Sequence, residues 1–375
     1  MARHTAPRPR PAPPSVGLSG DDRGSQHPRV LHLLNRGARS GAESVAISII
    51  QGCGGTGLYA SPDGPIADVL RGECIPFVPL HGQTPRQVRL AVDRTVPDIL
   101  HAHDYWATLA AAFSFSRRPV VAHIHQDPPW SHRPTLRSVL FLLASVRVDT
   151  IVYVSHSVRD EYVFSRLIAR KSVVLPNPVD VAAIRAAART AQSHDAYDIV
   201  FLGRLSPEKD PLRFVRLIDR VRAVVPGLSA AMIGTGPLEP AVAAAIASRG
   251  LADAVEMTGY LANPLGILSR AQLLCVPSHH EGFGLVAAEA IALGVPVVAS
   301  RVGGLRETVT PACGALCDDD DDFVAEIAHL LSDPTYRAAK AGACAARAEH
   351  LSSTDTYFAT LRLIYAAASR SDGVC

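Results

Sequence analysis

Short apolar runs recur along the first half of the chain and are separated by amphipathic stretches. Because each run is continuously apolar rather than alternating, it predicts a strand buried on both faces, as in a parallel sheet. Residues 40–50 predict a helix that begins beside a glycine. The runs span residues 29–35, 74–80, 98–103, 119–125, 150–155 and 172–177.

The second half repeats this alternation more clearly. Strands that alternate with helices indicate βαβ units in a doubly wound sheet. The polar, alanine-rich stretch 185–197 separates the two halves. The pattern therefore predicts an α/β protein with two Rossmann-like domains in tandem. Its predicted strands are 198–203, 228–234, 253–260, 273–278 and 296–300, and its helices are 211–225, 238–249 and 284–294.

Composition narrows the class of protein. The 375 residues are 48% hydrophobic, which is enough for two cores. The 37 basic and 35 acidic residues nearly cancel, so we expect no nucleic-acid partner. Residues 1–27 are rich in proline and arginine and predict a disordered tail without the apolar segment of a secretion signal. No apolar run is long enough to span a membrane, and an odd number of scattered cysteines indicates a reduced, cytoplasmic protein.

The segment FLGRLSPEKDP, residues 201–211, places two cations on one loop. A predicted strand ends at Gly203, and Arg204 and Lys209 follow before a helix near Pro211. Ligands of open α/β sheets bind where strand ends meet helix N-termini, and two cations there can bind two phosphate groups. The alternative is a solvated loop in which Lys209 pairs with a neighbouring carboxylate.

A second segment, 278–300, combines two glutamates with a glycine-rich helix start. Glu281 precedes the predicted helix and Glu289 lies inside it. Free backbone N–H groups at the helix start predict an anion site, and carboxylates suit sugar hydroxyls. The alternative has Glu281 favoured by the helix dipole and Glu289 on a solvated face. Two glycine motifs, GTGP at 234–237 and SGAE at 40–43, are weaker signals that a tight turn also explains.

Together these motifs resemble glycosyltransferase family 4, a group of retaining enzymes with the GT-B fold. The resemblance covers about residues 29–365 and is carried by the cationic loop, GTGP, EGFGLVAAEA, GVPVVAS with VGGLRETV, and by SGAESVA, HAHD, VSHSVRDEY and LPNPVD. HAHDYWA, HQDPPW and SPDGPI are similar to bacterial enzymes of capsule and exopolysaccharide assembly. The resemblance implies an acceptor domain over 28–184, a nucleotide-sugar domain over 185–354, and a C-terminal helix in 355–375 that packs on the first domain.

The resemblance also implies roles for the matching residues. Arg204 and Lys209 would neutralise the diphosphate of the donor, and Glu281 would hold sugar hydroxyls. Glu289 would bind the ribose, and His125 would lie near the anomeric carbon. Further donor contacts would be Gly41, Gly234, Gly259, Tyr260, Leu261, Phe283, Gly284 and Leu285, and acceptor contacts would be His103, Asp104 and Trp130.

We therefore expect a retaining glycosyltransferase that moves a sugar from a UDP-sugar to a hydroxyl of a glycan, a lipid-linked acceptor or a small natural product such as an antibiotic. The family is thought to use no protein nucleophile, so catalysis would rest on positioning and electrostatics. Two alternatives remain open. One is a GT-B protein that binds a sugar nucleotide without turnover, and the other is an epimerase of the same fold.

Three other features of the sequence bear on metal or lipid binding. His101, His103, His123 and His125 form two H-x-H pairs, but the sequence offers no third ligand cluster. CDDDDDF, residues 317–323, precedes a helix whose dipole it complements. We expect no metal at either place and no cofactor. The arginine-flanked stretch 134–148 predicts a core helix in preference to contact with an anionic membrane face.

Overall fold

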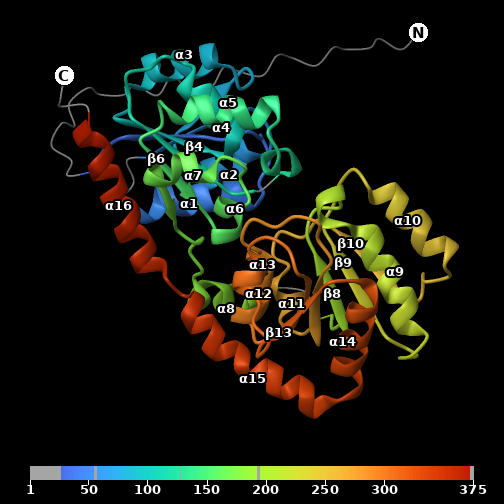
Figure 1. Ribbon diagram of the computed structural model, residues 1–375. Coiled ribbons are helices and arrows are strands. Elements are labelled where there is room, and N and C mark those ends of the chain that lie inside the picture. Colours follow the sequence, from blue (N-terminus) through green and yellow to red (C-terminus); the bar gives the residue numbers. More distant parts are fainter. Residues whose placement is uncertain (1–26, 55–56, 127, 192–194, 372–375) are drawn as a thin grey trace, which may run out of the picture.

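The structure is a computed structural model that describes residues 27–54, 57–126, 128–191 and 195–371 (Figure 1). The predicted tail, residues 1–26, lies outside the described residues. The described residues form two parallel sheets, each covered by helices, which confirms the α/β class.

The first sheet has seven strands in the order β3-β2-β1-β4-β5-β6-β7, and every neighbouring pair is parallel. Continuous apolar runs form its central strands because helices cover both faces. One strand, β2, was not predicted: it begins at a glycine and ends at a proline, which weaken the apolar signal. The strands are β1 (Val30–Leu33), β2 (Gly57–Pro62), β3 (Phe77–Leu80), β4 (Ile99–His103), β5 (Val120–Ile124), β6 (Thr150–Tyr153) and β7 (Ser172–Val174).

The second sheet has six parallel strands in the order β10-β9-β8-β11-β12-β13. Five of them coincide with predicted strands, and β13 was not predicted. They are β8 (Ile199–Leu202), β9 (Ala230–Ile233), β10 (Val255–Gly259), β11 (Leu273–Val276), β12 (Val297–Ser300) and β13 (Gly314–Cys317).

The helices of the first domain lie on both faces of its sheet, and those of the second domain do the same (Figure 1). In the first domain they are α1 (Gly41–Gly52), α2 (Ile66–Gly72), α3 (Pro85–Thr95), α4 (Asp104–Ala112), η1 (Pro129–His132), α5 (Leu136–Ser145), α6 (His156–Asp160), α7 (Ser165–Ile168) and η2 (Ala169–Lys171). From the crossover onward they are α8 (Val181–Arg189), η3 (Pro207–Lys209), α9 (Pro211–Arg222), α10 (Glu239–Ser248), α11 (Leu265–Leu268), α12 (Leu285–Ala292), α13 (Leu305–Thr308), α14 (Asp320–Ser332), α15 (Pro334–Leu351) and α16 (Thr354–Ser371).

The chain crosses between the domains twice. Helix α8 packs against α11 and α12 of the second domain, so the stretch expected as the boundary begins inside a helix of that domain. At the other end α15 lies along the second domain, and α16 returns to the first (Figure 1). Tyr357, Leu361 and Tyr365 of α16 share a buried apolar cluster with Val30 and Ile49 of the first domain.

Each sheet reverses its strand order at one place, between β1 and β4 in the first and between β8 and β11 in the second. In open α/β sheets the crevice at such a switch point, beyond the carboxyl ends of the strands, is where ligands bind. Gly41 begins the helix after β1, His103 ends β4, and Lys209 and Glu281 lie in the loops after β8 and β11. The topology therefore brings most of the predicted site residues to these two crevices.

Candidate active site

The loop after β8 presents the two predicted cations differently. Arg204 is exposed, and none of the described residues forms a hydrogen bond or ion pair with its side chain. Lys209, in contrast, forms an ion pair with Glu281, whose side chain is only 11% exposed. Ser278 Oγ also donates to the same carboxylate oxygen of Glu281 over 3.2 Å. Lys209 therefore does not pair with a carboxylate of its own loop, because its partner Glu281 lies in the loop after β11.

The GTGP turn packs against this cationic loop. Gly234 has a positive φ of 133°, and a Cβ there would overlap the backbone of Gly203. The N–H of Leu205 donates to the carbonyl of Thr235 over 3.0 Å. Only glycine fits at Gly234, so the motif shapes the loop that carries Arg204 and Lys209.

The segment EGFG lies where the second domain meets the first. A Cβ on Gly282 would lie 2.7 Å from the carbonyl carbon of His125 and closer still to its oxygen. Ser155 of the first domain donates its hydroxyl to the carbonyl of Gly282 over 2.7 Å. The glycine is therefore required for the close approach of the two domains beside His125.

Two side chains after Gly282 serve a purpose that sequence reasoning missed. Phe283 is buried in the apolar cluster of the first domain, and Leu285 packs against the same cluster. The Cδ1 of Leu285 would meet a Cβ on Gly41 at 3.3 Å. The N-terminus of α12, which begins after Gly284 with a φ of 84°, is thus adjacent to the N-terminus of α1. Two helix N-termini at one place favour binding of a negatively charged group.

Glu307 of α13 adds a second clamp between the domains. Its carboxylate accepts from the backbone N–H groups of His156 and Ser157 over 3.1 and 2.9 Å. The neighbouring Arg306 forms an ion pair of 3.1 Å with Glu161 of the first domain. The segment VGGLRETV gave a resemblance but no role for these residues, because nothing in the sequence indicates which strand end they face.

Glu289 lies on α12 in a half-buried position. Burial raises the pKa of its carboxyl to about 7, and Arg39 of the first domain opposes this shift. None of the described residues forms a hydrogen bond with it. A second carboxyl, that of Glu43, is buried on α1 and accepts a hydrogen bond from Ser40; burial raises its pKa too. Glu43 was not predicted as a site residue.

The segment from Gly259 to Leu261, predicted to contact the donor, lies at the end of β10. Gly259 has a φ of 70°, and its carbonyl accepts from the N–H of Gly234 over 2.8 Å. Tyr260 is 69% exposed, and Leu261 packs against the apolar cluster beneath α12. The segment thus lies next to the GTGP turn.

His103, for which an acceptor contact was predicted, lies buried inside the first domain. Its two ring nitrogens contact ring nitrogens of His32 and His125 at 3.1 and 2.9 Å. Asp104, with a φ of 73°, accepts from the backbone N–H of His125 over 3.0 Å, and burial raises the pKa of its carboxyl to about 7. Trp130 is half-buried, edge-on to Tyr105. The sequence placed His103 correctly at the carboxyl end of β4, but it does not show which residues bury this side chain.

Two groups of histidines among the described residues come close enough to suggest a metal site. Each brings three ring nitrogens within 4.8 Å of one another. Several of these rings are stacked, however, with interplanar angles of 19° for His101 on His103 and 27° for His123 on His125. Stacked rings direct their in-plane lone pairs side by side, whereas a tetrahedral ion needs them to converge.

The aspartate run is explained by local structure. Asp319 caps α14 and accepts from the N–H groups of Asp321 and Asp322, both over 2.9 Å. Asp320 pairs with Arg213 over 2.6 Å. Charges at a helix N-terminus and in ion pairs account for this composition.

Within the described part of the chain, no helix is long and apolar enough to cross a membrane.

Two Rossmann-like domains whose strand-end loops face each other around a cationic loop define the GT-B class of glycosyltransferases. The family profiles described as Glycosyltransferase Family 4 and Glycosyl transferases group 1 match residues 29–183 and 185–347. The chain belongs to this family, glycosyltransferase family 4 of the GT-B fold.

Individual relatives agree with this assignment. The glycogen synthase of Mycobacterium tuberculosis is 30% identical in an alignment of 306 positions that covers 76% of this chain and 73% of the relative. A D-inositol 3-phosphate glycosyltransferase of Stackebrandtia nassauensis is 31% identical in an alignment of 277 positions that covers 64% of this chain and 62% of the relative. The crystal structure of Anabaena HepE in complex with UDP-glucose superimposes with a TM-score of 0.79 at 21% identity, over 91% of this chain and all of that chain. This last likeness shows the fold.

Proposed function

We propose that the protein is a retaining glycosyltransferase that transfers a sugar from a UDP-sugar to a hydroxyl of a glycan, a lipid-linked acceptor or a small natural product. The observation that carries the proposal is the ion pair of Lys209 with Glu281 beside the adjacent N-termini of α1 and α12. The HepE structures, which are complexes with UDP and with UDP-glucose, favour a UDP-sugar as the donor.

The ion pair of Lys209 with Glu281 suggests how the site works. When a donor binds, its diphosphate competes with Glu281 for Lys209, and the freed carboxylate can accept hydrogen bonds from sugar hydroxyls. Negative charge grows on the diphosphate as the glycosidic bond breaks. Arg204, Lys209 and the two helix N-termini stabilise this charge more in the transition state than in the ground state, which raises kcat.

No protein nucleophile is required in this scheme. The departing phosphate oxygen takes the proton of the acceptor hydroxyl on the same face of the sugar, so the anomeric configuration is retained. Glu289 binds the ribose, and His125 lies near the anomeric carbon at the domain junction. The two cations and the helix N-termini meet the diphosphate charge, so we propose that no metal ion or other cofactor takes part.

A donor panel tests the proposal. Thermal shifts with UDP, GDP and dTDP sugars should be largest for a UDP-sugar, and transfer to an acceptor library should give a product whose anomeric proton coupling matches that of the donor. An inverted product would contradict the retaining mechanism. A thermal shift without any product would favour the non-catalytic binding protein, and a changed sugar still attached to UDP would favour the epimerase.

We further propose that the first domain contacts an anionic membrane face from the cytoplasm. Helix α5 buries Phe141 but exposes Leu136, Leu143 and the following Val146 by 76%, 53% and 74%. One face of the helix therefore packs in the core, as predicted, and the other face is exposed and apolar. Arg147 lies over the exposed ring of Phe115, 4.7 Å from its centroid, so an apolar surface is bordered by positive charge.

Co-sedimentation with vesicles tests this contact. Binding to phosphatidylglycerol vesicles and not to phosphatidylcholine vesicles is expected, and Leu143→Glu should abolish it. Val224→Glu, at an apolar position of the second domain that is 61% exposed, is the matched control and should bind like the wild type. Equal binding by both variants would contradict the proposed surface.

A further inference from the structure

Five buried histidines lie together on one face of the first sheet. The register pairs His32 of β1 with His101 of β4, and His103 of β4 with His123 of β5. Side chains two residues apart on a strand share a face, so His125, which follows β5, joins the same group. The structure buries all five to at least nine-tenths.

Three of the rings form a row joined edge to edge. Nδ1 of His32 lies 3.1 Å from Nε2 of His103, and Nδ1 of His103 lies 2.9 Å from Nε2 of His125. The rings of His103 and His125 are nearly coplanar, at 11°, with centroids 5.2 Å apart. Burial lowers the pKa of His32 and of His125 to about 3, and that of His103 is lowered as well, so all three rings are neutral at pH 7. A neutral imidazole has one N–H, so the three rings must all donate in the same direction along the row.

The other two histidines form a second layer on this row. His101 stacks on His103 and His123 stacks on His125, with centroids 4.4 and 4.2 Å apart. Nδ1 of His101 lies 2.6 Å from the hydroxyl of Tyr365, which fixes this layer to α16. Both ring nitrogens of His123 are buried and have no hydrogen-bond partner among the described residues, so His123 contributes packing and takes no part in the row.

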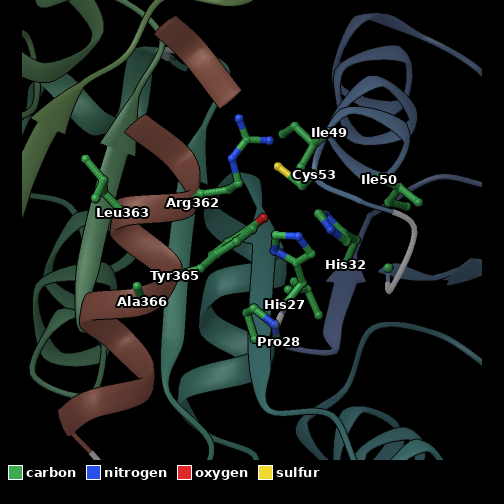
Figure 2. A pocket seen from close by; sticks show the side chains of 12 residues that line it. His27, Pro28, His32, Ile49, Ile50, Cys53, Arg362, Leu363, Tyr365 and Ala366 are labelled. Carbon is green, nitrogen blue, oxygen red and sulfur yellow. The ribbon is translucent and has the colours of Figure 1, made fainter. Parts of the chain in front are cut away.

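The surroundings of the two ends decide the direction of the row. If the hydrogen bonds ran from His32 to His125, the last N–H would sit on Nδ1 of His125, a buried atom for which the structure has no partner. If they run from His125 to His32, the last N–H sits on Nε2 of His32. His32 lines a cavity of about 280 Å³ with Cys53, Arg362 and Tyr365 (Figure 2), which has room for water. A buried N–H without an acceptor is rarer in proteins than an unused lone pair, so the second direction is favoured.

We propose that His103 and His32 are positioning residues that hold His125 as its Nε2–H tautomer and so leave the Nδ1 lone pair as a hydrogen-bond acceptor at the domain junction beside Gly282. The role of that acceptor rests on the proposed function, which places His125 near the anomeric carbon: the free lone pair would accept a hydroxyl of the sugar bound there. The N–H on Nε2 of His32 then faces the cavity, and this end of the row fixes the direction of its hydrogen bonds.

Nitrogen NMR of the protein labelled with ¹⁵N-histidine tests the tautomers directly. In the wild type, His125, His103 and His32 should each show a protonated Nε2 and a bare Nδ1. In His32→Phe the Nε2–H of His103 loses its acceptor, so either direction of the row leaves one buried N–H unpaired, and His103 and His125 should become mixtures of the two tautomers. His32→Asn, whose side-chain oxygen can replace the lost Nδ1 acceptor, should restore the wild-type tautomers. His123→Phe is the matched control, because it changes a ring of the same buried cluster without removing a hydrogen bond of the row, and its tautomers should stay as in the wild type.

Kinetics give the second readout. His32→Phe should lower kcat/KM about tenfold, the usual effect of one hydrogen bond, while His32→Asn and His123→Phe stay within about twofold of the wild type. A wild-type His125 protonated on Nδ1, or a His32→Phe variant with unchanged tautomers, would overturn the proposal. Equal losses in His32→Phe and His123→Phe would show that packing alone matters. The NMR result does not depend on turnover. If the tautomers are as predicted but the protein transfers no sugar, the proposed function is refuted and the proposed row of histidines is still supported.

Discussion

Replacing Gly282 by alanine should separate the two domains where the chemistry is proposed to occur. The new Cβ would lie 2.7 Å from the carbonyl carbon of His125. Non-bonded carbons stay about 3.5 Å apart, so the two segments must move apart by about 0.8 Å or more. The two atoms closest to the Cβ belong to the backbone of His125, so no side-chain rotation relieves the overlap. The shift would also lengthen the 2.7 Å hydrogen bond from Ser155 to Gly282.

A displacement of this size at reacting groups costs about 10²-fold in rate, so we expect kcat/KM to fall by that factor. UDP binding should change by less than about fivefold, because Arg204, Lys209 and Glu289 all lie in the second domain. Initial rates with the donor identified by the panel, and the thermal shift with UDP, measure the two effects. Gly342→Ala is the control, since a Cβ on this α15 glycine meets no atom within 4 Å and should leave the rate unchanged. A rate for Gly282→Ala within twofold of the wild type would refute the close domain contact.

Four further predictions follow from the site and its surroundings. Lys209→Ala should lower kcat about 10²–10³-fold with a smaller change in donor KM, and Arg204→Ala should act similarly, with less than additive loss in the double variant; near-normal turnover in steady-state assays would contradict the leaving-group role. Glu289→Ala should mainly raise the donor KM, because ribose contacts change little during the reaction, and a pure kcat effect would contradict this. Activity should persist in excess EDTA, whereas loss and full recovery with manganese would return the aspartate run to consideration. Burial lowers the pKa of the buried histidines in the folded state below about 6.5, so acidification below pH 6.5 should lower the free energy of unfolding by up to about 1.4 kcal/mol per pH unit for each histidine. Asp104 and Glu289, whose pKa values are raised in the folded state, partly offset this loss. Urea unfolding from pH 7.5 to 5.5 should show a smaller loss in His123→Phe than in the wild type.

Sequence patterning determined the alternation of strands and helices and most element positions. This was predictable because strands of a parallel sheet are buried on both faces, so their apolar runs stand out. The pattern failed at β2, which begins with Gly57 and ends with Pro62, and where Ser61 is buried among apolar neighbours. It also gave no sign of α15, an alanine-rich helix in which Cys344 and Ala348 are the buried residues.

Local motifs determined which loops carry charge, but not the partners of those charges. The sequence placed Lys209 after one strand and Glu281 after another, and their pairing depends on β8 and β11 being neighbours in the sheet. Strand order is set by contacts between segments far apart in the chain, which periodicity cannot report. The same limit hid Glu307, whose partners are backbone amides of the other domain.

The histidines show this division most clearly. H-x-H spacing placed two pairs on two strands, and with no third ligand in view it argued against a metal site. Only the sheet register adds His32 beside His101, and only the ring planes show that three of the five rings are joined edge to edge while two stack on them. Side-chain spacing along a strand follows from the backbone repeat of two, which the sequence contains. The angle between rings on different strands follows from packing against α1 and α16, which the tertiary structure alone decides.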